Sequence, residues 1–325
     1  MINKKFRNEI SIPKYGLEIN HNRPLISFGS CFSKHIHNYL EYCGFGAEYH
    51  YGTIYNPISI ADNLKKCLEK LEFKSDDLTL LNEIYLSWYH SGTIFNQNKD
   101  ILLQKINENQ KLVLKTLNNN PVVIITFGSA YVYSLKSNGK IVANCHKKPN
   151  TLFKKRKLSI QQIVTKWTDF IHKTDAEFIF TVSPVRHLKD GFVENNRSKS
   201  VLLLAIEQLC NSFPKKVNYF PSYEIMIDEL RDYRFYAKDW VHPSKEAVDF
   251  ICQKFSESFF KNETTKIVDN IIKIRHKLAH RPIYGLTNNY VDFLNKTLDD
   301  ISNVKEKTKL YDWSHEVNKI NQQLI

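Results

Sequence analysis

Two short segments, far apart in the chain, carry residue types that could perform nucleophilic catalysis. Residues 29–31 (Gly-Ser-Cys) end an apolar run and precede a helical pattern, which places a hydroxyl and a thiol at a turn between a strand and a helix. Residues 239–242 (Asp-Trp-Val-His) have the spacing of an orienting pair, in which the carboxylate accepts the imidazole Nδ1–H and leaves Nε2 facing a nucleophile. Together the two segments predict a nucleophile, a general base and an orienting acid.

Cys31 is the favoured nucleophile, and Ser30 is the alternative. Backbone N–H groups that follow Gly29 at the start of the predicted helix supply both a positive dipole end and donors for an oxyanion. A free thiol titrates at about pH 8.5, so a modest downward shift of the pKa makes Cys31 a thiolate at working pH. The other interpretation of this segment is that Cys31 packs in the core and Ser30 caps the helix.

Asp239 and His242 are the predicted orienting acid and general base. Pro243 supports this assignment, because a proline at a first helical position fixes the direction in which His242 points. Without the upstream nucleophile, the same pair would be an aspartate near a helix start beside a surface histidine.

Strand-like and helix-like segments alternate through most of the chain, which predicts an α/β fold with a parallel sheet covered by helices. Residues 24–29, 121–126 and 177–182 have the pattern of strands, and the β-branched run in the second is typical of a strand buried on both faces. In an open parallel sheet, ligands bind at the carboxyl ends of the strands. We therefore expect the loops that follow these strands to converge with the loop of Asp239 and His242.

The chain is expected to have two parts, a catalytic domain over residues 1–262 and a helical C-terminal extension over residues 263–325. Beyond Asn262 the sequence has few β signals and the pattern of helices with a polar end. No internal repeat and no long low-complexity linker interrupts the chain.

The composition is that of an ordinary globular protein, with 42% hydrophobic and 25% charged residues. No apolar stretch approaches the roughly 18 residues of a membrane span, and the segment from Met1 to Glu9 lacks the apolar region of a secretory signal, so we expect a cytoplasmic protein. The formal charge of +12 is compatible with an anionic partner, such as nucleic acid, a phosphorylated carrier or an acidic glycan. A solvated, lysine-rich surface explains the charge as well, and no nucleic-acid-binding motif accompanies it.

The six cysteines are scattered without C-x-x-C spacing, which favours neither a zinc ribbon nor a disulfide framework. Cys145, His146 and His187 could hold a metal ion, but adjacent residues rarely chelate one ion well and no ligand spacing supports such a site. We expect no metal and no cofactor.

Several further residues, most of them near predicted strand ends, are candidates for oxyanion or substrate contacts. They are Gly29, Gly52, Gly128, Ser129, Asn144, His146, Arg186 and His187. His146, together with Lys147, could recognise an anionic or hydroxylated substrate. Arg186 and His187 directly follow a strand end, where they could contact the substrate. The alternative interpretation is that they are polar residues on the surface of a solvated loop.

Motifs along most of the chain resemble those of the GSCFA-domain family, a branch related to the SGNH/GDSL esterases and acyltransferases. The matching stretches cover about residues 20 to 255 in the order of the family. They are residues 29–33, 55–57, 128–133, 144–147, 183–187, 195–199 and 235–244.

This resemblance implies a flavodoxin-like three-layer α/β/α sandwich. Asp239 and His242 match the Asp-x-x-His block of the SGNH hydrolases. When residues 28–31 are laid on the Gly-Asp-Ser-Leu block, Cys31 falls at the position of the nucleophilic serine and Ser30 falls at the aspartate.

Two departures from the SGNH pattern bear on the activity. A thiol replaces the serine, and the Gly-x-Asn-Asp block appears as residues 128–131 (Gly-Ser-Ala-Tyr), which lacks the asparagine that helps to form the oxyanion hole. Asn144, Ser129, His90 or the backbone at Gly52 could supply that donor.

The sequence therefore predicts an SGNH-like acyl-transfer enzyme, either an ester hydrolase or an O-acyltransferase, that acts on a carbohydrate. Its partners would be an acyl ester or another acyl donor and a glycan acceptor. A thioester intermediate suits transfer to an acceptor hydroxyl as well as to water. The alternative is a catalytically silent module that binds a glycan or a nucleotide-linked sugar, with the C-terminal helices docking a partner such as a glycosyltransferase. The oligomeric state stays open.

Overall fold

A computed structural model describes residues 8–324 of the chain. The expectation that the N-terminus carries no secretory signal concerns Met1 to Glu9, and most of that segment lies outside the described residues.

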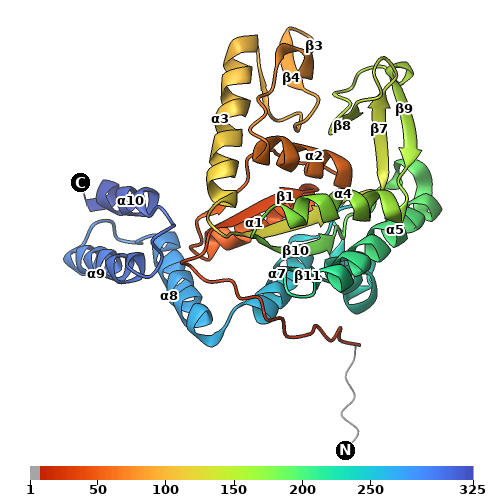
Figure 1. Cartoon of the computed structure of the whole chain (residues 1–325). Coiled ribbons are helices and arrows are strands. Elements are labelled where there is room, and N and C mark those ends of the chain that lie inside the picture. Colours follow the sequence, from red (N-terminus) through yellow and green to blue (C-terminus); the bar gives the residue numbers. More distant parts are fainter. Residues whose placement is uncertain (1–7, 325) are drawn as a thin grey trace, which may run out of the picture.

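The centre of the molecule is a sheet of five parallel strands in the order β11-β10-β6-β1-β2 (Figure 1). Its strands are β1 (Leu25–Gly29), β2 (Ala47–Glu48), β6 (Val122–Phe127), β10 (Glu177–Val182) and β11 (Val217–Phe220). Counted along the chain, this is the arrangement 2-1-3-4-5 of doubly wound flavodoxin-like folds. The predicted α/β fold with a parallel sheet is confirmed.

Helices cover both faces of this sheet, because the central strands are apolar on both sides. All six residues of β6 are buried. Val123 and Ile125 belong to the hydrophobic cluster on one face, and Val122 and Ile124 belong to that on the other. The first face is packed by α2 (Pro57–Leu68), α3 (Lys99–Leu117), α4 (Ile160–His172) and α5 (Gly191–Ser212), and the second by α1 (Cys31–Tyr42) and α7 (Lys245–Phe259).

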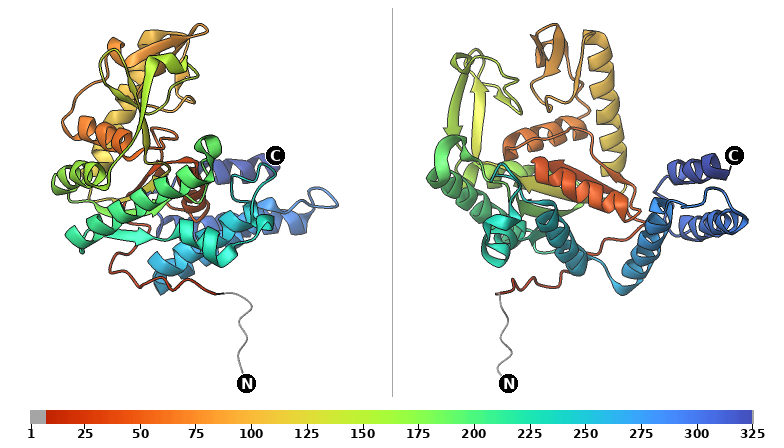
Figure 2. Two further views of the ribbon diagram at one scale, coloured as in Figure 1. Left: turned by 90° about the vertical axis from the view of Figure 1, so that its right-hand side faces the viewer. Right: turned by 180° about the vertical axis from the view of Figure 1, so that it is seen from behind.

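Two small antiparallel sheets rise from the same side of the main sheet (Figures 1 and 2). One consists of β3 (Leu78–Leu81), β4 (Ile84–Ser87) and β5 (Phe95–Asn96), and the other of β7 (Tyr131–Leu135), β8 (Ile141–Val142) and β9 (Phe153–Lys157). Because β7 follows the end of β6 almost directly, the second small sheet stands at the carboxyl edge of the main sheet, where the site residues are expected.

Beyond α7 the chain forms three helices, α8 (Asn262–Ala279), α9 (Asn288–Lys305) and α10 (Ser314–Leu324), which share a hydrophobic cluster of their own. The predicted C-terminal helices are confirmed. Arg275 of α8 forms an ion pair with Glu316 of α10, and its guanidinium also lies over the ring of Trp313. Among residues 8–324, no helix combines the length and the apolar character that crossing a bilayer requires.

Candidate active site

The turn that carries the predicted nucleophile lies directly on the neighbouring strand. Gly29 ends β1 with φ +137°, and a Cβ atom at this position would lie 2.2 Å from the carbonyl oxygen of Thr126 on β6. The N–H of Ser30 donates to that same oxygen at 3.0 Å. Only glycine permits this close approach, so Gly29 makes the chain turn above β6 and begin α1 at Cys31.

The turn also lies at the switch point of the sheet. The strands that follow β1 lie on opposite sides of it, β2 on one side and β6 on the other. In a doubly wound sheet, ligands bind in the crevice that forms at this point, outside the carboxyl ends of the strands. The fold therefore places Ser30 and Cys31 where a substrate can reach the sheet.

The two candidate nucleophiles differ in accessibility. Ser30 is 1% exposed and its Oγ has no hydrogen-bond partner in the part of the chain that the structure describes, whereas Cys31 is partly exposed. Burial raises the pKa of the Cys31 thiol, while Lys199 and the backbone N–H groups of Cys31 and Phe32 oppose that increase. A thiol in this setting is protonated at neutral pH and needs a base before it can attack.

Asp239 and His242 form the orienting pair that their spacing predicts. The Nδ1–H of His242 donates to Oδ2 of Asp239 at 2.6 Å, and the backbone N–H groups of Val241 and His242 both donate to Oδ1 at 3.0 Å. These bonds, the backbone bond from His242 foremost, lower the pKa of Asp239 to about 2. Trp240, between these two residues, adopts a left-handed conformation with φ +59°. Nε2 of His242 has no hydrogen-bond partner among residues 8–324.

The charges of this pair act on the first turns of α1. The charge of Asp239 acts to raise the pKa of Cys31. The pKa of His35, one turn further along α1, is lowered by burial and then by the charge of His242. Cys31 and His242 therefore belong to one region of the surface, although no hydrogen bond joins them within the described structure.

Aromatic rings flank this region. The backbone N–H of Arg186 donates to the carbonyl of Val241 at 3.2 Å, which connects the loop after β10 with the loop that carries His242. Its guanidinium lies 4.1 Å from the ring centroid of Tyr236 and 5.4 Å from that of Tyr233. Tyr233 is 58% exposed and Trp240 is 56% exposed, with their ring centroids 5.7 Å apart. The histidine is thus bordered by an open aromatic surface.

A cavity of about 250 Å³ lies between the second small sheet and the loop after β10. It brings together three residues that the sequence analysis selected, namely Ser129, Asn144 and His187. Tyr55 also lines the cavity, packs against Gly128, and has its pKa raised by burial and by the charge of Cys31. The cavity and the nucleophile are therefore neighbours that share Tyr55.

Two of the predicted oxyanion donors are already in use. The N–H groups of Gly128 and Ser129 both donate to the carbonyl of Tyr55, at 2.8 and 3.0 Å. Asn144 differs, since its Oδ1 accepts the N–H of His146 while its Nδ2 has no acceptor among the described residues. The side chain of Asn144 is therefore a free donor in the cavity wall.

Gly52 lies beside the nucleophile turn. It has φ +66°, and a Cβ atom there would come within 2.5 Å of the Cβ of Ser91. The next two residues hold the turn, because Thr53 pairs with Gly29 and the N–H of Ile54 donates to the carbonyl of Gly29 at 2.8 Å.

His146 and His90 are buried and do not line the cavity. His146 is 4% exposed, and its Nε2 bonds to the carbonyl of Ser87 at 2.8 Å. His90 is fully buried, with Nδ1 bonded to Oγ of Ser87, and burial lowers its pKa to about 3. Among residues 8–324, no group of three or more His, Cys, Asp or Glu side chains is arranged to hold a metal ion.

Lys199 of α5 is a site residue that the sequence analysis did not select. It is 1% exposed, and its Nζ donates to the carbonyls of Gly128 at 2.9 Å and Ser183 at 2.7 Å. Burial lowers its pKa to about 7, and the charge of Cys31 opposes that shift. One signal was present in the sequence, because Lys199 has helical spacing to Leu202, Ile206 and Leu209, which form the buried stripe of α5. A lysine in the inward stripe of a helix needs a polar partner.

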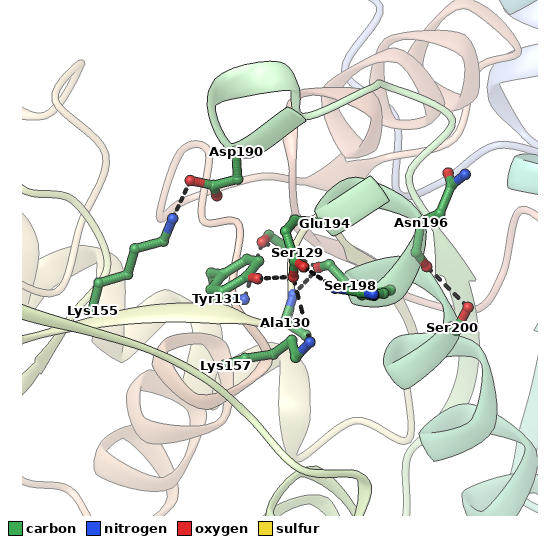
Figure 3. A network of polar contacts seen from close by, with 11 residues as sticks. Ser129, Ala130, Tyr131, Lys155, Lys157, Asp190, Glu194, Asn196, Ser198 and Ser200 are labelled. Carbon is green, nitrogen blue, oxygen red and sulfur yellow. Dashed lines mark hydrogen bonds and ion pairs between the residues drawn. The ribbon is translucent and has the colours of Figure 1, made fainter. Parts of the chain in front are cut away.

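Polar contacts fix the wall of the cavity to the start of α5 (Figure 3). The hydroxyl of Ser198 accepts the N–H of Ala130 at 2.8 Å, and the hydroxyl of Tyr131 donates to Glu194. Further along the same small sheet, Lys155 forms an ion pair with Asp190. These contacts hold β7 and β9 against the segment that follows His187 and so define the width of the cavity.

Comparison with known protein families gives two matches. Residues 24–255 match the GSCFA family, and residues 271–325 match the family described as GSCFA domain protein, C-terminal domain. The first range contains both the nucleophile turn and the Asp239/His242 loop. No curated protein matches the chain.

Proposed function

The chain belongs to the GSCFA family, and on that premise we propose that it is an acyl-transfer enzyme in which Cys31 attacks, His242 is the general base and Asp239 orients the base. One observation carries the proposal. A histidine is fixed by a 2.6 Å bond to a carboxylate, and the charges of this pair act on the start of α1, where Cys31 is a partly exposed thiol. A nucleophile, a base and an orienting acid in one place are the parts of covalent acyl transfer.

The reaction would proceed in two steps. Nε2 of His242 removes the thiol proton of Cys31, the sulfur attacks the acyl carbonyl, and the tetrahedral oxyanion is held by the N–H groups at the start of α1 and by Nδ2 of Asn144. The carbon–oxygen bond to the donor then breaks, and the departing alcohol takes the proton from His242. In the second step His242 removes a proton from water or an acceptor hydroxyl, which attacks the thioester, and the thiol of Cys31 is regenerated.

We include a relation to the SGNH/GDSL enzymes in the proposal, because the two motifs that resemble their blocks lie at the start and the end of the α/β unit. Cys31 begins the helix that follows β1, and His242 lies three residues before α7 begins. The thiol in place of serine favours a transferase, since a thioester transfers its acyl group readily to a hydroxyl.

A carbohydrate acceptor suits the cavity. Tyr55, Tyr131 and Tyr133 provide aromatic faces, while Ser129 and Asn144 provide polar groups. Aromatic faces with a few convergent hydrogen-bonding groups fit a sugar ring and its hydroxyls. We include in the proposal an acyl ester or another acyl donor, a glycan acceptor, and a cytoplasmic location, where a reducing environment keeps Cys31 a free thiol.

A silent glycan- or nucleotide-sugar-binding module is the second candidate. It is favoured by the raised pKa of Cys31 and by the lack of a hydrogen bond between Cys31 and His242 in the described structure. In that case the cavity would bind a sugar without performing chemistry on it.

Intact-protein mass after brief exposure to an activated aryl acetate tests the proposal. We expect one acetyl adduct in the wild type that is lost in Cys31→Ala, forms slowly in His242→Ala, and is retained in Cys145→Ala, the matched control for the other partly exposed thiol near the cavity. Dependence on Ser30→Ala instead of Cys31→Ala would indicate a serine enzyme. No adduct at all, with sugar binding intact, would favour the silent module.

A further inference from the structure

Lys199 is a buried ionisable group that the proposed mechanism does not use. Its Nζ donates to the carbonyls of Gly128 and Ser183, which follow the ends of β6 and β10. Gly128 in turn lies against the nucleophile turn, since a Cβ atom on it would be 3.1 Å from the Cβ of Ser30. Gly128 therefore connects the amine with the residue that precedes Cys31.

No carboxylate forms an ion pair with Lys199 among the described residues. The titratable groups that face its amine are Cys31 from α1, His187 from the loop after β10, and Tyr223 from α6 (Ser222–Glu224), whose ring centroid is 5.6 Å from Nζ. Of these, Cys31 is the group whose negative charge favours the protonated amine. An isolated ammonium is unfavourable in such a site, and a thiolate would make it favourable.

The reverse influence acts on the thiol. Besides the proposed base His242, the groups coupled to Cys31 by their charge are Lys199 from α5, Asp239 from the histidine loop, and Tyr49 and Tyr55 from the segment after β2. Asp239 acts against a thiolate, whereas Lys199 acts in its favour. The interaction between two titrating groups is reciprocal, so each charge promotes the other.

The number of hydrogens on the amine fits this reciprocity. A neutral amine has two N–H groups, and the carbonyls of Gly128 and Ser183 accept two hydrogen bonds. The neutral form is thus fully satisfied while the thiol is protonated. A third hydrogen would have no acceptor in the described structure until a negative charge forms nearby.

We propose that Lys199 is the charge partner of Cys31, and that the buried pair of thiol and amine is in equilibrium with a pair of thiolate and ammonium before an acyl donor reacts. These two forms contain the same number of protons, because the proton that leaves the sulfur is the one gained by the amine. When His242 takes the thiol proton during acylation, the amine takes up a proton from solvent and so stabilises the thiolate. Lys199 acts through Cys31 and touches no substrate, so it is a positioning residue. The inference rests on the proposed function only in taking Cys31 as the nucleophile.

The pH dependence of Cys31 alkylation by iodoacetamide tests this pairing, with the modified peptide measured by mass spectrometry. For a coupled pair, the alkylation rate of the wild type should rise with pH, level off from about pH 7, where the amine loses its proton, and rise again when the last proton leaves. A lone thiol would show a single rise. We expect His242→Ala to keep the intermediate plateau and Lys199→Met to lose it, with alkylation at about pH 7.5 reduced about tenfold, equivalent to one pKa unit.

Lys216→Met is the matched control. Its Nζ also donates to a backbone carbonyl, that of Thr174 at 2.7 Å, but it precedes β11 at the opposite end of the sheet. This variant should retain the wild-type profile. Lys199→Arg keeps the positive charge and should restore fast alkylation at neutral pH relative to Lys199→Met, which a merely structural role of Lys199 would not predict.

If Lys199→Met fails to fold, as judged by circular dichroism, the profiles of the wild type and His242→Ala decide. A single rise in the wild type, or a plateau that disappears in His242→Ala, would overturn the inference. The two proposals fail separately. A plateau that depends on Lys199, without any acetyl adduct, would contradict acyl transfer and leave the charge pair standing. An acetyl adduct together with a single rise in alkylation would contradict the charge pair and leave acyl transfer standing.

Discussion

Oδ2 of Asp239 accepts the Nδ1–H of His242 at 2.6 Å, while Oδ1 of the same carboxylate accepts the backbone N–H of His242 at 3.0 Å. The carboxylate therefore fixes both the ring and the backbone of the histidine. With Nδ1 bound in this way, Nε2 is the atom available to exchange a proton with a nucleophile.

Asp239→Asn should abolish most of the acylation while leaving the fold intact. An amide keeps the size of the side chain but can hold the imidazole in the wrong tautomer, and we expect the rate of acetyl-adduct formation to fall by about a hundredfold or more. The thermal midpoint should hardly change, because the pair is about half exposed. Asp249→Asn is the control, since Asp249 forms an exposed ion pair with Lys245 on α7. Equal losses in both variants would contradict the orienting role.

Asn144→Asp should slow acylation through the loss of one donor. The substitution keeps the Oδ1 acceptor for the N–H of His146 but replaces Nδ2, the free donor of the cavity wall, with a second oxygen. We expect adduct formation to slow by about a hundredfold. Asn138→Asp is the matched control, because Asn138 likewise accepts a backbone N–H, that of Lys140, and lies away from the cavity. An unchanged rate in Asn144→Asp would remove this residue from the oxyanion site.

Gly29→Ala should destabilise the protein severely. A methyl group there would lie 2.2 Å from the carbonyl oxygen of Thr126, in a backbone conformation that favours glycine, so we expect a loss of about 3 kcal/mol or more in the free energy of unfolding. Gly16→Ala, which has open space around the position, should change it by less than about 0.5 kcal/mol. Urea unfolding of both variants measures the difference, and equal stabilities would show that the turn can relax.

The free energy of unfolding should depend on pH because the amine of Lys199 is buried. Lys199 has a pKa of about 7 in the folded chain, against about 10.4 for an unperturbed lysine. Between these values the unfolded chain binds more protons, so the contribution of Lys199 to stability rises with pH, by at most about 1.4 kcal/mol per pH unit. Below about pH 7 both states hold the proton and the slope vanishes.

Urea unfolding at about pH 7 and about pH 9 measures this effect as a difference between the wild type and Lys199→Met. Between these two pH values the free energy of unfolding should rise less in Lys199→Met than in the wild type, while Lys216→Met should show the same rise as the wild type. A wild type and a Lys199→Met variant with the same pH dependence would mean that Lys199 titrates normally.

The central strands β1, β6 and β10 were predictable because they are local apolar runs, whereas β2 (Ala47–Glu48) was not predicted. Residues 121–126 were predicted as a buried strand, and β6 occupies Val122–Phe127 with every residue buried. The small sheet of β7, β8 and β9 was not predicted. Its strands are short, and β9 (Phe153–Lys157) contains three lysines and an arginine, so its pairing with β7 depends on a distant partner rather than on its own pattern.

The sequence by itself determined the two reactive segments, because residues 29–31 and 239–242 are each contiguous and their residue types and spacing are visible in the chain. Only the tertiary structure decided which groups surround them. Lys199 binds the carbonyls of Gly128 and Ser183, and the carbonyl of Tyr55 takes the N–H groups of Gly128 and Ser129. Those partners are backbone atoms, which every residue carries alike. The linear order of side chains cannot distinguish one carbonyl from another, and it is the packing of α5 on the ends of two parallel strands that selects these two.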